Sequence, residues 1–335
     1  MKKVVIIGGD GIGPEVVKSA RSVIEYLGTP VEFVDAEIGL SAYKKTGTYL
    51  PKSTLDFLAE SDACLFGAIT TPEDPQYDSP LLYIRKYFNL YANVRPFRRL
   101  IPSIGLVDMD IVIVRENTED VYTGIERETE EGVILERKIT EKACKRIVRF
   151  AINLCEKKGR KKITCVHKAN VMRKSDGLFR KIFFEETKKT KLMANDIHVD
   201  AMAAALISNP TAYDCIVTLN LYGDILSDEA AALVGGLGIA PSANIGDGFG
   251  LFEPCHGSAP DIAGKGIANP VAAILSSALM LEYLNLPNLA ERIQNAVRIA
   301  LEHGIRTPDL GGTHSTESFT RALLSIIEEI ESQDD

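Results

Sequence analysis

The sequence predicts an α/β protein with two lobes. Short apolar runs typical of strands alternate with segments of helical periodicity, which favours much parallel pairing. A length of 335 residues is long for a single core. The hydrophobic content of 45% and the charged content of 25% are those of an ordinary globular protein.

The expected elements follow in chain order. The apolar runs predict strands at Lys3–Ile7, Val31–Val34, Ala63–Phe66, Asp110–Val114, Lys162–Val166 and Cys215–Leu219. The helical patterns predict helices at Pro14–Leu27, Lys52–Ala59, Leu81–Leu90, Glu141–Lys157, Pro270–Leu284, Ala290–His303 and Glu317–Ser332. Thr70 to Pro75 is expected to be a loop.

One segment, Thr123 to Thr140, breaks the alternation. It has two extended runs around Glu130, Glu131 and Gly132, which predicts a projecting β-hairpin. A lone hairpin is marginally stable in water, so we expect it to pair with something, such as a second subunit.

Composition excludes several classes of protein. The net charge of −8 argues against a nucleic-acid binder. The six cysteines form no C-x-x-C pair and no Cys/His zinc spacing, which favours small buried hydrophobes. The N-terminal apolar run has the length of a strand rather than a signal sequence, and the longest apolar helix is too short for a bilayer. We therefore expect a cytoplasmic protein with no membrane or nucleic-acid partner.

Two aspartates, Asp224 and Asp228, stand four residues apart in the segment from Asn220 to Glu229. On a helix this spacing places both on one face, a turn apart, where carboxylate oxygens suit Mg²⁺ or Mn²⁺. Spacing alone favours a plainer alternative, a carboxylate at a helix N-terminus beside a solvated one. The polar residues elsewhere in the chain reverse that preference.

Other polar residues follow the predicted strands. Arg115 comes after one strand and Lys168 after another, while Arg85, Arg95 and Tyr122 lie nearby in the sequence. Ligands of open α/β sheets bind beyond the carboxyl ends of strands. Arginines hold carboxylates bidentately, and lysine and tyrosine exchange protons. Singly, each residue has an ordinary surface or packing role. Together they suit metal-dependent oxidation of a hydroxy-diacid followed by loss of CO₂.

The glycine-rich turn from Gly9 to Glu15 does not fit the dinucleotide fingerprint. The G-x-G-x-x-G spacing fails because Glu15 and Val16 follow Gly13. The turn is more simply a tight connection from strand to helix, although it could still touch a cofactor.

Six segments in order carry a resemblance to a known family: Gly9–Glu15, Tyr91–Pro96, Val114–Glu119, His167–Asn170, Asn220–Asp228 and Glu253–Gly264. The chain resembles the isocitrate/3-isopropylmalate dehydrogenase family, the decarboxylating β-hydroxyacid dehydrogenases, over nearly its whole length. The resemblance implies an isopropylmalate dehydrogenase-like, non-Rossmann fold with two α/β domains around a mixed sheet. Residues 1–90 and 235–335 would form the cofactor-side domain. Residues 91–234 would form the dimerisation and substrate domain, with the arm at about 123–140.

The resemblance also implies roles for site residues. The carboxylate clamps would be Arg85, Arg95 and Arg115; the metal ligands Asp200, Asp224 and Asp228; the catalytic residues Tyr122 and Lys168. In the family, Lys168 and Asp200 serve the site of the partner subunit, so a homodimer or higher homo-oligomer is implied. Lys168 would take the hydroxyl proton as hydride leaves for the nicotinamide, and Tyr122 would protonate the enolate after CO₂ departs.

The stretch around Asp261 predicts the cofactor. A carboxylate accepts hydrogen bonds from a ribose 2′-OH and repels a 2′-phosphate. Members of the family that use NADP carry a Lys-Tyr pair at this place. We therefore expect NAD. The implied cofactor contacts are Ile12, Thr70, Asn170, Glu253, His256, Gly257, Asp261, Ile262, Asn269 and Asp309. Without the resemblance, His256 would more often be a structural histidine.

The helix before Arg85 bears on the substrate. Isopropylmalate enzymes of the family carry the pattern acid-x-x-Leu-Leu in this helix, and Asp78, Leu81 and Leu82 match it. Two leucines suit an isopropyl group and Asp78 would repel a third carboxylate. We therefore favour 3-isopropylmalate, converted to 2-oxoisocaproate in leucine biosynthesis. Ser79 and the Thr70 loop look more like homoisocitrate or isocitrate enzymes, which are the alternative. The leucines could also be helix core.

A different class is a non-catalytic regulatory subunit, or a binding protein for citrate-like acids. Regulatory subunits usually lose a metal aspartate or the lysine–tyrosine pair, and this chain keeps both.

Overall fold

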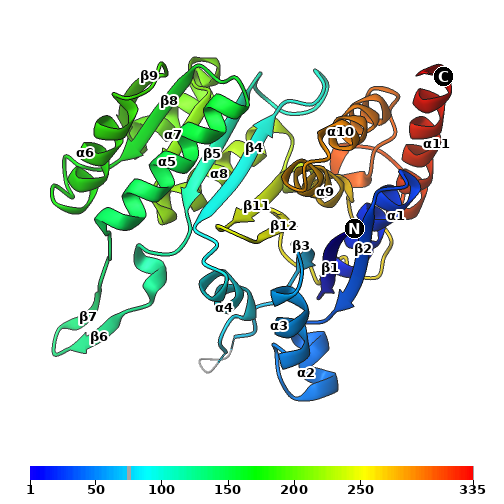
Figure 1. Ribbon diagram of the computed structural model, residues 1–335, viewed down its shortest axis with the longest axis horizontal. Helices are drawn as coiled ribbons and strands as arrows, with labels where there is room; N and C mark the ends of the chain where they lie inside the picture. Colours follow the sequence, from blue (N-terminus) through cyan, green and yellow to red (C-terminus); the bar gives the residue numbers. More distant parts are fainter. Residues whose placement is uncertain (74–76, 335) are drawn as a thin grey trace.

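The computed structural model describes residues 1–73 and 77–334. Of the predicted loop, Asp74 and Pro75 lie outside the described residues. The described chain forms one ten-stranded mixed sheet with helices on both faces, in the strand order β2-β1-β3-β12-β11-β4-β5-β10-β8-β9. The sheet runs across the whole molecule in Figure 1.

One half of the sheet contains the N-terminal strands. Its members are β1 (Lys2–Gly9), β2 (Val31–Ala36), β3 (Ala63–Ala68), β11 (Pro241–Ile245) and β12 (Gly250–Pro254). Strands β1, β2, β3 and β12 pair in parallel, and β11 is antiparallel to β12. The helices of this half are α1 (Gly13–Tyr26), α2 (Leu40–Thr46), α3 (Lys52–Ala59), α4 (Pro80–Tyr87), α9 (Val271–Tyr283), α10 (Pro287–Glu302) and α11 (Thr316–Asp334). Both chain termini lie on this side of the molecule (Figure 1).

The other half is built from the middle of the chain. Its strands are β4 (Ala92–Arg98), β5 (Asp110–Glu116), β8 (Lys162–His167), β9 (Met193–His198) and β10 (Cys215–Thr218). Its helices are α5 (Glu141–Lys157), α6 (Ser175–Thr187), α7 (Val199–Ser208) and α8 (Asn220–Val234). Four short 3-10 turns complete the chain: η1 (Val121–Thr123), η2 (Pro210–Ala212), η3 (Leu237–Ile239) and η4 (Pro308–Leu310).

Strands β11 and β4 join the two halves. They pair antiparallel, with Asn244 opposite Asn93 and Ile245 opposite Ala92. The proposed domain division, 1–90 with 235–335 against 91–234, falls between these strands. The division stays a prediction, and the backbone pairing makes the sheet continuous across it.

The projecting hairpin is confirmed as β6 (Glu126–Thr129) and β7 (Gly132–Leu135), a two-stranded sheet of its own. All eight residues are exposed. In Figure 1 it extends away from the body of the molecule, joined to it through η1 and the start of α5. Its apolar residues Val133, Ile134 and Leu135 are 41–65% exposed, so they are available to a partner.

The core consists of apolar clusters on the two faces of the sheet. Strand β3 is buried along its whole length, which explains its unbroken apolar sequence. Five of the six cysteines are buried and Cys255 is half-buried, as the composition predicted. Among the described residues, no helix combines the length and apolar character needed to cross a bilayer.

Candidate active site

Three parallel strands end at one edge of the sheet, and polar residues follow each of them. Thr218 of β10 lies between Arg115 of β5 and Val166 of β8 in the strand register. Lys168 follows β8 and Asn220 follows β10. Because parallel strands bring their carboxyl ends together, residues distant in sequence meet at this edge.

Arg115 is buried against the start of α8. Its Nε donates to Asn220 Oδ1 at 2.9 Å, and its Nη1 forms an ion pair with Asp224. A Cβ on Gly223 would lie 2.6 Å from the Arg115 side chain, so the glycine permits this close approach. Burial lowers the pKa of Arg115 to about 10 despite the Asp224 charge. The guanidinium therefore remains charged at neutral pH.

Tyr122 lies in the same cluster, on η1. Its hydroxyl donates to the other carboxylate oxygen of Asp224, and the Arg115 guanidinium lies 5.1 Å from its ring centre. Burial and the bond to Asp224 raise the pKa of Tyr122 to about 12. At neutral pH the phenol is therefore protonated and can serve as a proton donor.

Arg95 approaches the same carboxylates from β4. Its Nη1 donates to Ser227 Oγ at 2.6 Å and lies 3.8 Å from Asp224 Oδ1 and 3.6 Å from Asp228 Oδ1. Its side chain is 9% exposed. Since α8 spans Asn220–Val234, the two aspartates lie one turn apart on a helix, as their spacing predicted.

The two aspartates differ in their electrostatic environment. Burial by itself raises the pKa of Asp224, but the Arg115 charge and the Tyr122 hydroxyl outweigh it and hold the pKa below its usual range. Burial also raises the pKa of Asp228, and the negative charge of Asp224 adds to the increase. A divalent cation would relieve this repulsion, and carboxylate oxygens are the donors that Mg²⁺ and Mn²⁺ prefer. The two residues therefore fit a metal.

Arg85 completes the group of arginines and reveals residues that sequence reasoning missed. Its Nη2 donates to Glu253 Oε1 at 2.9 Å, and Asn244 donates to the same oxygen at 2.7 Å. Asn93 and Asn117 each donate to Asn244 Oδ1 at 3.0 Å. These buried side chains link β4, β11 and β12 to the residue that follows β5, next to Arg85. The signal for it was polar residues placed inside strands.

The two leucine side chains of α4 lie in different surroundings. Leu82 is exposed toward a small cavity, whereas Leu81 packs against an apolar core cluster. That cavity is lined by Leu82, Arg85, Lys86, Arg115, Asn117, Thr118, Tyr122 and Asn220. Ser79 caps α4 by accepting the Leu82 N–H at 3.4 Å, and Asp78 is exposed. The structure thus groups Leu82, but not Leu81, with the arginines.

Lys168 and Asp200 form a pair apart from this cluster. Lys168 Nζ donates to Asp200 Oδ1 at 2.5 Å, and the Asp200 side chain is 66% exposed. Among the described residues, no three His, Cys, Asp or Glu side chains are close enough to hold a metal. Asp200 therefore does not join Asp224 and Asp228 within one chain.

The turn after β1 meets two other loops. The Ile12 N–H donates to the Ser258 carbonyl at 2.8 Å, and Thr70 Oγ1 donates to Ser258 Oγ at 2.8 Å. Gly11 has a φ of +59°, and a Cβ there would lie 1.9 Å from the Ser258 carbonyl. The predicted contacts Ile12 and Thr70 are thus brought together around a residue that was not predicted.

A second group of predicted cofactor residues comes from three segments: His256 and Gly257 follow β12, Asn269 precedes α9 and Asp309 lies in η4. Asn269 donates to Asp309 Oδ2 at 2.9 Å. His256 Nδ1 donates to the Gly257 carbonyl at 2.9 Å, and its buried Nε2 has no partner among the described residues. Burial lowers the pKa of His256, so the ring is neutral and Nε2 is an acceptor. Such an acceptor fits the amino group of an adenine.

The remaining predicted cofactor residues are dispersed. Asp261 is exposed and Ile262 packs against the core, both in the segment between β12 and α9. Asn170 is exposed beside Lys168 in the other half of the sheet, and Glu253 is held by Arg85.

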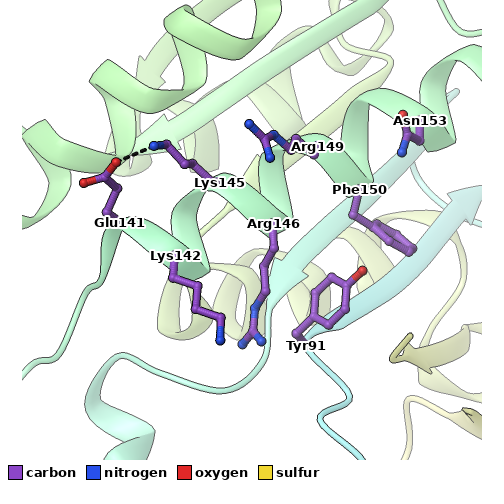
Figure 2. Close-up of a pocket in the computed structure, with 8 residues that line it drawn as sticks. All are labelled: Tyr91, Glu141, Lys142, Lys145, Arg146, Arg149, Phe150 and Asn153. Atoms are coloured by element: carbon purple, nitrogen blue, oxygen red, sulfur yellow. Dashed lines mark hydrogen bonds and ion pairs between the residues drawn. The ribbon is translucent and has the colours of Figure 1, made fainter. Parts of the chain in front are cut away.

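A separate groove lies along α5, with a volume of about 680 Å³. It is lined by Tyr91, Glu141, Lys142, Lys145, Arg146, Arg149, Phe150 and Asn153, none of them a predicted site residue. Figure 2 shows the pair of Lys145 with Glu141, and Arg149 pairs with Glu186. Because most of its charges are neutralised within the chain, the groove is not the candidate site.

Comparison with known proteins bears on the whole chain. Residues 3–323 match the model of the isocitrate/isopropylmalate dehydrogenase family. A homoisocitrate dehydrogenase of Methanocaldococcus jannaschii is 49% identical, with 98% of each chain covered. A 3-isopropylmalate/3-methylmalate dehydrogenase of the same organism is also 49% identical, covering 98% of this chain and 100% of the relative.

A solved structure agrees with these relatives. The β-decarboxylating dehydrogenase of Thermococcus kodakarensis, in its apo form, superposes with a TM-score of 0.90 at 43% identity, covering 100% of this chain and 98% of that one. The fold expected from the resemblance is therefore confirmed. The chain belongs to the isocitrate/isopropylmalate dehydrogenase family and is an enzyme of the decarboxylating dehydrogenase class.

Proposed function

We propose that this enzyme carries out the NAD-dependent and divalent-metal-dependent oxidative decarboxylation of a malate-type 2-hydroxy acid. The favoured substrate is 3-isopropylmalate, which would place the enzyme in leucine biosynthesis. The observation that carries the proposal is the convergence of Arg95 and Arg115 on Asp224, with Tyr122 bonded to the same carboxylate.

The arrangement of cations suits a dicarboxylate. Arg85, Arg95 and Arg115 are mostly buried and lie around one small cavity or the carboxylates beside it. Fixed guanidinium groups recognise carboxylates through paired hydrogen bonds, at little further entropic cost. We therefore assign the three arginines to the two carboxylates of the substrate.

Proton movements belong to Tyr122 and Lys168. Lys168 of the partner subunit accepts the proton of the C2 hydroxyl as the C2 hydride leaves, so the alcohol becomes a ketone. The resulting β-keto acid loses CO₂, and the bond electrons form an enolate. Tyr122, with its pKa raised to about 12, retains its proton until the enolate carbon accepts it.

The cofactors supply the remaining chemistry. A divalent ion held by Asp224, Asp228 and the partner's Asp200 would polarise the hydroxyl and neutralise the developing negative charge. NAD would accept the hydride. Ile12, Thr70, His256, Asn269 and the exposed carboxylate of Asp261 would bind the dinucleotide, and Asp261 favours NAD over NADP because it would repel a 2′-phosphate.

A second copy of the chain is needed to assemble this site. Exposed apolar residues cluster on the arm, where Val133 is 65% and Leu135 43% exposed, and on α7 and α8, where Ile207 is 59% and Ile225 58% exposed. Exposed apolar side chains on adjoining elements are typical of subunit interfaces. We propose a homodimer, in the reducing cytoplasm that six unpaired cysteines suit.

The substrate preference rests on Leu82. Its side chain is 39% exposed and lines the cavity beside Arg85 and Arg115, where it would contact an isopropyl group. Among the described residues, the cations that line this cavity are Arg85, Arg115 and Lys86. The expected preference for an apolar group over a third carboxylate therefore rests on the apolar contact with Leu82.

Homoisocitrate or isocitrate is the second candidate, and Ser79 favours it. Its hydroxyl oxygen accepts the Leu82 N–H, and a serine hydroxyl can also donate a hydrogen bond to a third carboxylate. The two relatives of equal identity are named for homoisocitrate and for 3-isopropylmalate, so similarity alone favours neither.

The test is steady-state reduction of NAD with 3-isopropylmalate, homoisocitrate, isocitrate and malate, each with Mg²⁺ and with Mn²⁺. We expect the highest kcat/KM with 3-isopropylmalate. A higher value with homoisocitrate or isocitrate would reverse the substrate assignment. A purified oligomer that turns over none of the acids would point instead to a regulatory subunit or a binding protein.

A further inference from the structure

Arg137 lies at the base of the arm, just after β7, and its guanidinium contacts two fully buried carboxylates. Its Nε forms an ion pair with Asp120, its Nη1 forms another with Asp176, and its Nη2 donates to Asp120 Oδ2 at 3.2 Å. Both carboxylate side chains are 0% exposed, and Arg137 is 16% exposed. One guanidinium therefore bridges two acids that lie 56 positions apart in the sequence, at 120 and 176.

Asp120 fixes the segment that carries Tyr122. Its two carboxylate oxygens accept the N–H groups of Val121 and Leu221, each at 3.0 Å. Its backbone has a φ of +72°, which is uncommon for a residue with a side chain and needs support from its surroundings. Asp120, two residues before Tyr122, thus links the turn η1 to the start of α8.

Asp176 fixes the segment that carries Lys168. Its Oδ2 accepts the backbone N–H of Lys168 at 2.7 Å and the Tyr222 hydroxyl at 3.0 Å. The Arg137 guanidinium also lies 4.9 Å from the centre of the Tyr222 ring. Removing Arg137 would leave two buried carboxylates without their shared counter-charge.

We propose that Arg137 is a positioning residue for both Tyr122 and Lys168. The inference rests on the proposed function, in which these two residues of one chain serve two different sites of the dimer. Arg137 then joins one half of each site within a single chain. Since it also forms the base of the arm, it connects subunit contact to both sites.

The first test compares Arg137→Met with Arg149→Met in the homodimer. Methionine keeps the apolar stem, so we expect kcat to fall by about 100-fold, the effect of displacing a reacting group by about 1 Å. KM for the hydroxy acid should change less than about twofold, because Arg85, Arg95 and Arg115 stay in place. The Arg149 side chain is 58% exposed and, in the described chain, forms a single ion pair, with Glu186, so its variant should keep wild-type values.

Arg137→Lys separates positioning from stability, and serves if the methionine variant does not fold. Lysine keeps the charge but cannot bridge two carboxylates through a planar fork. We expect it to restore the melting temperature largely while kcat remains well below the wild-type value. Wild-type kcat in Arg137→Lys, or in folded Arg137→Met, would overturn the proposal.

The second test uses heterodimers with one working site. One chain carries Asp224→Asn and a distinct affinity tag, so the intact site combines Tyr122 of the other chain with Lys168 of the Asp224→Asn chain. Arg137→Met should reduce turnover whichever chain carries it. An effect from one chain only would overturn the double role. Adding Lys168→Met to the Asp224→Asn chain should abolish the remaining turnover. Turnover that survives would overturn the shared site itself, and with it the link between sites.

Discussion

The cluster around Asp224 and the pair of Lys168 with Asp200 differ in how the chain holds them. Asp224 is bonded to Arg115 and Tyr122 and lies near Arg95, all within one chain. Within the part of the chain that the structure describes, the Lys168 and Asp200 side chains bond to each other, and Asp200 is 66% exposed. The contrast indicates that the first group is preorganised, whereas the second is, in our proposal, completed by another subunit.

Replacing Lys168 should have the largest effect. Lys168→Met removes the proposed proton acceptor, and we expect kcat to fall by about 1,000-fold, within the range of general acid–base catalysis. The melting temperature should not change, because an exposed ion pair contributes little to stability. Stopped assays and thermal unfolding would measure both. Lys145→Met, which breaks an exposed pair with Glu141, is the control.

If Lys168→Met retained activity, or lost its fold along with it, the exposed pair would be a structural ion pair. The comparison between a preorganised cluster and an incomplete one would then fail.

Leu82 tests the substrate side of the preorganised cluster. Leu82→Arg places a cation beside Arg85, and we expect kcat/KM to shift toward homoisocitrate over 3-isopropylmalate by about 10- to 200-fold. Tyr87→Arg, on the exposed face of the same helix, should leave the preference unchanged. An unaltered preference in Leu82→Arg would show that this side chain does not meet the substrate.

The stability of the cluster can be measured directly. Asp224→Asn leaves the Arg115 charge buried without its partner, so the free energy of unfolding should fall by about 2 kcal/mol. Asp200→Asn should leave it unchanged, since that carboxylate is exposed. Urea unfolding of both variants without metal would decide. Equal effects would remove the difference between the two groups.

The smallest effect concerns the support beneath Lys168. Burial raises the pKa of Asp196, but hydrogen bonds from Arg180 and His167 outweigh it and hold the pKa below its usual range. The resulting stabilisation is present above the unfolded-state pKa and is lost as pH falls through the folded-state value. Asp196→Asn should therefore reduce the loss of stability between about pH 5 and pH 2. An unchanged pH profile would contradict this.

Periodicity and motif spacing predicted the elements with uniform apolar faces. Strands β1, β3, β5 and β8, the hairpin and the long helices agree with expectation to within a few residues. Strands β4, β11 and β12 were not predicted, because each carries buried polar residues or proline. Arg95 and Pro96 interrupt β4, and Asn244 and Glu253 interrupt the other two. The buried polar residues of the site thus interrupted the apolar pattern from which these strands could have been predicted.

The spacing of Asp224 and Asp228 and the order of motifs predicted the residues of the main cluster. The supporting groups Asp120, Arg137 and Asp176 could not be predicted, because their contacts join segments that only the tertiary fold brings together. Leu81 and Leu82 were treated alike, yet the turn of α4 directs one to the core and the other to the site.

The most direct test of an active site completed by a second subunit is to mix two inactive variants. Lys168→Met and Asp224→Asn chains, unfolded together and refolded or co-expressed, should recover about one quarter of wild-type kcat, because about half of the dimers are mixed and each has one intact site. If the mixture shows no more activity than either variant alone, the two groups do not meet across subunits.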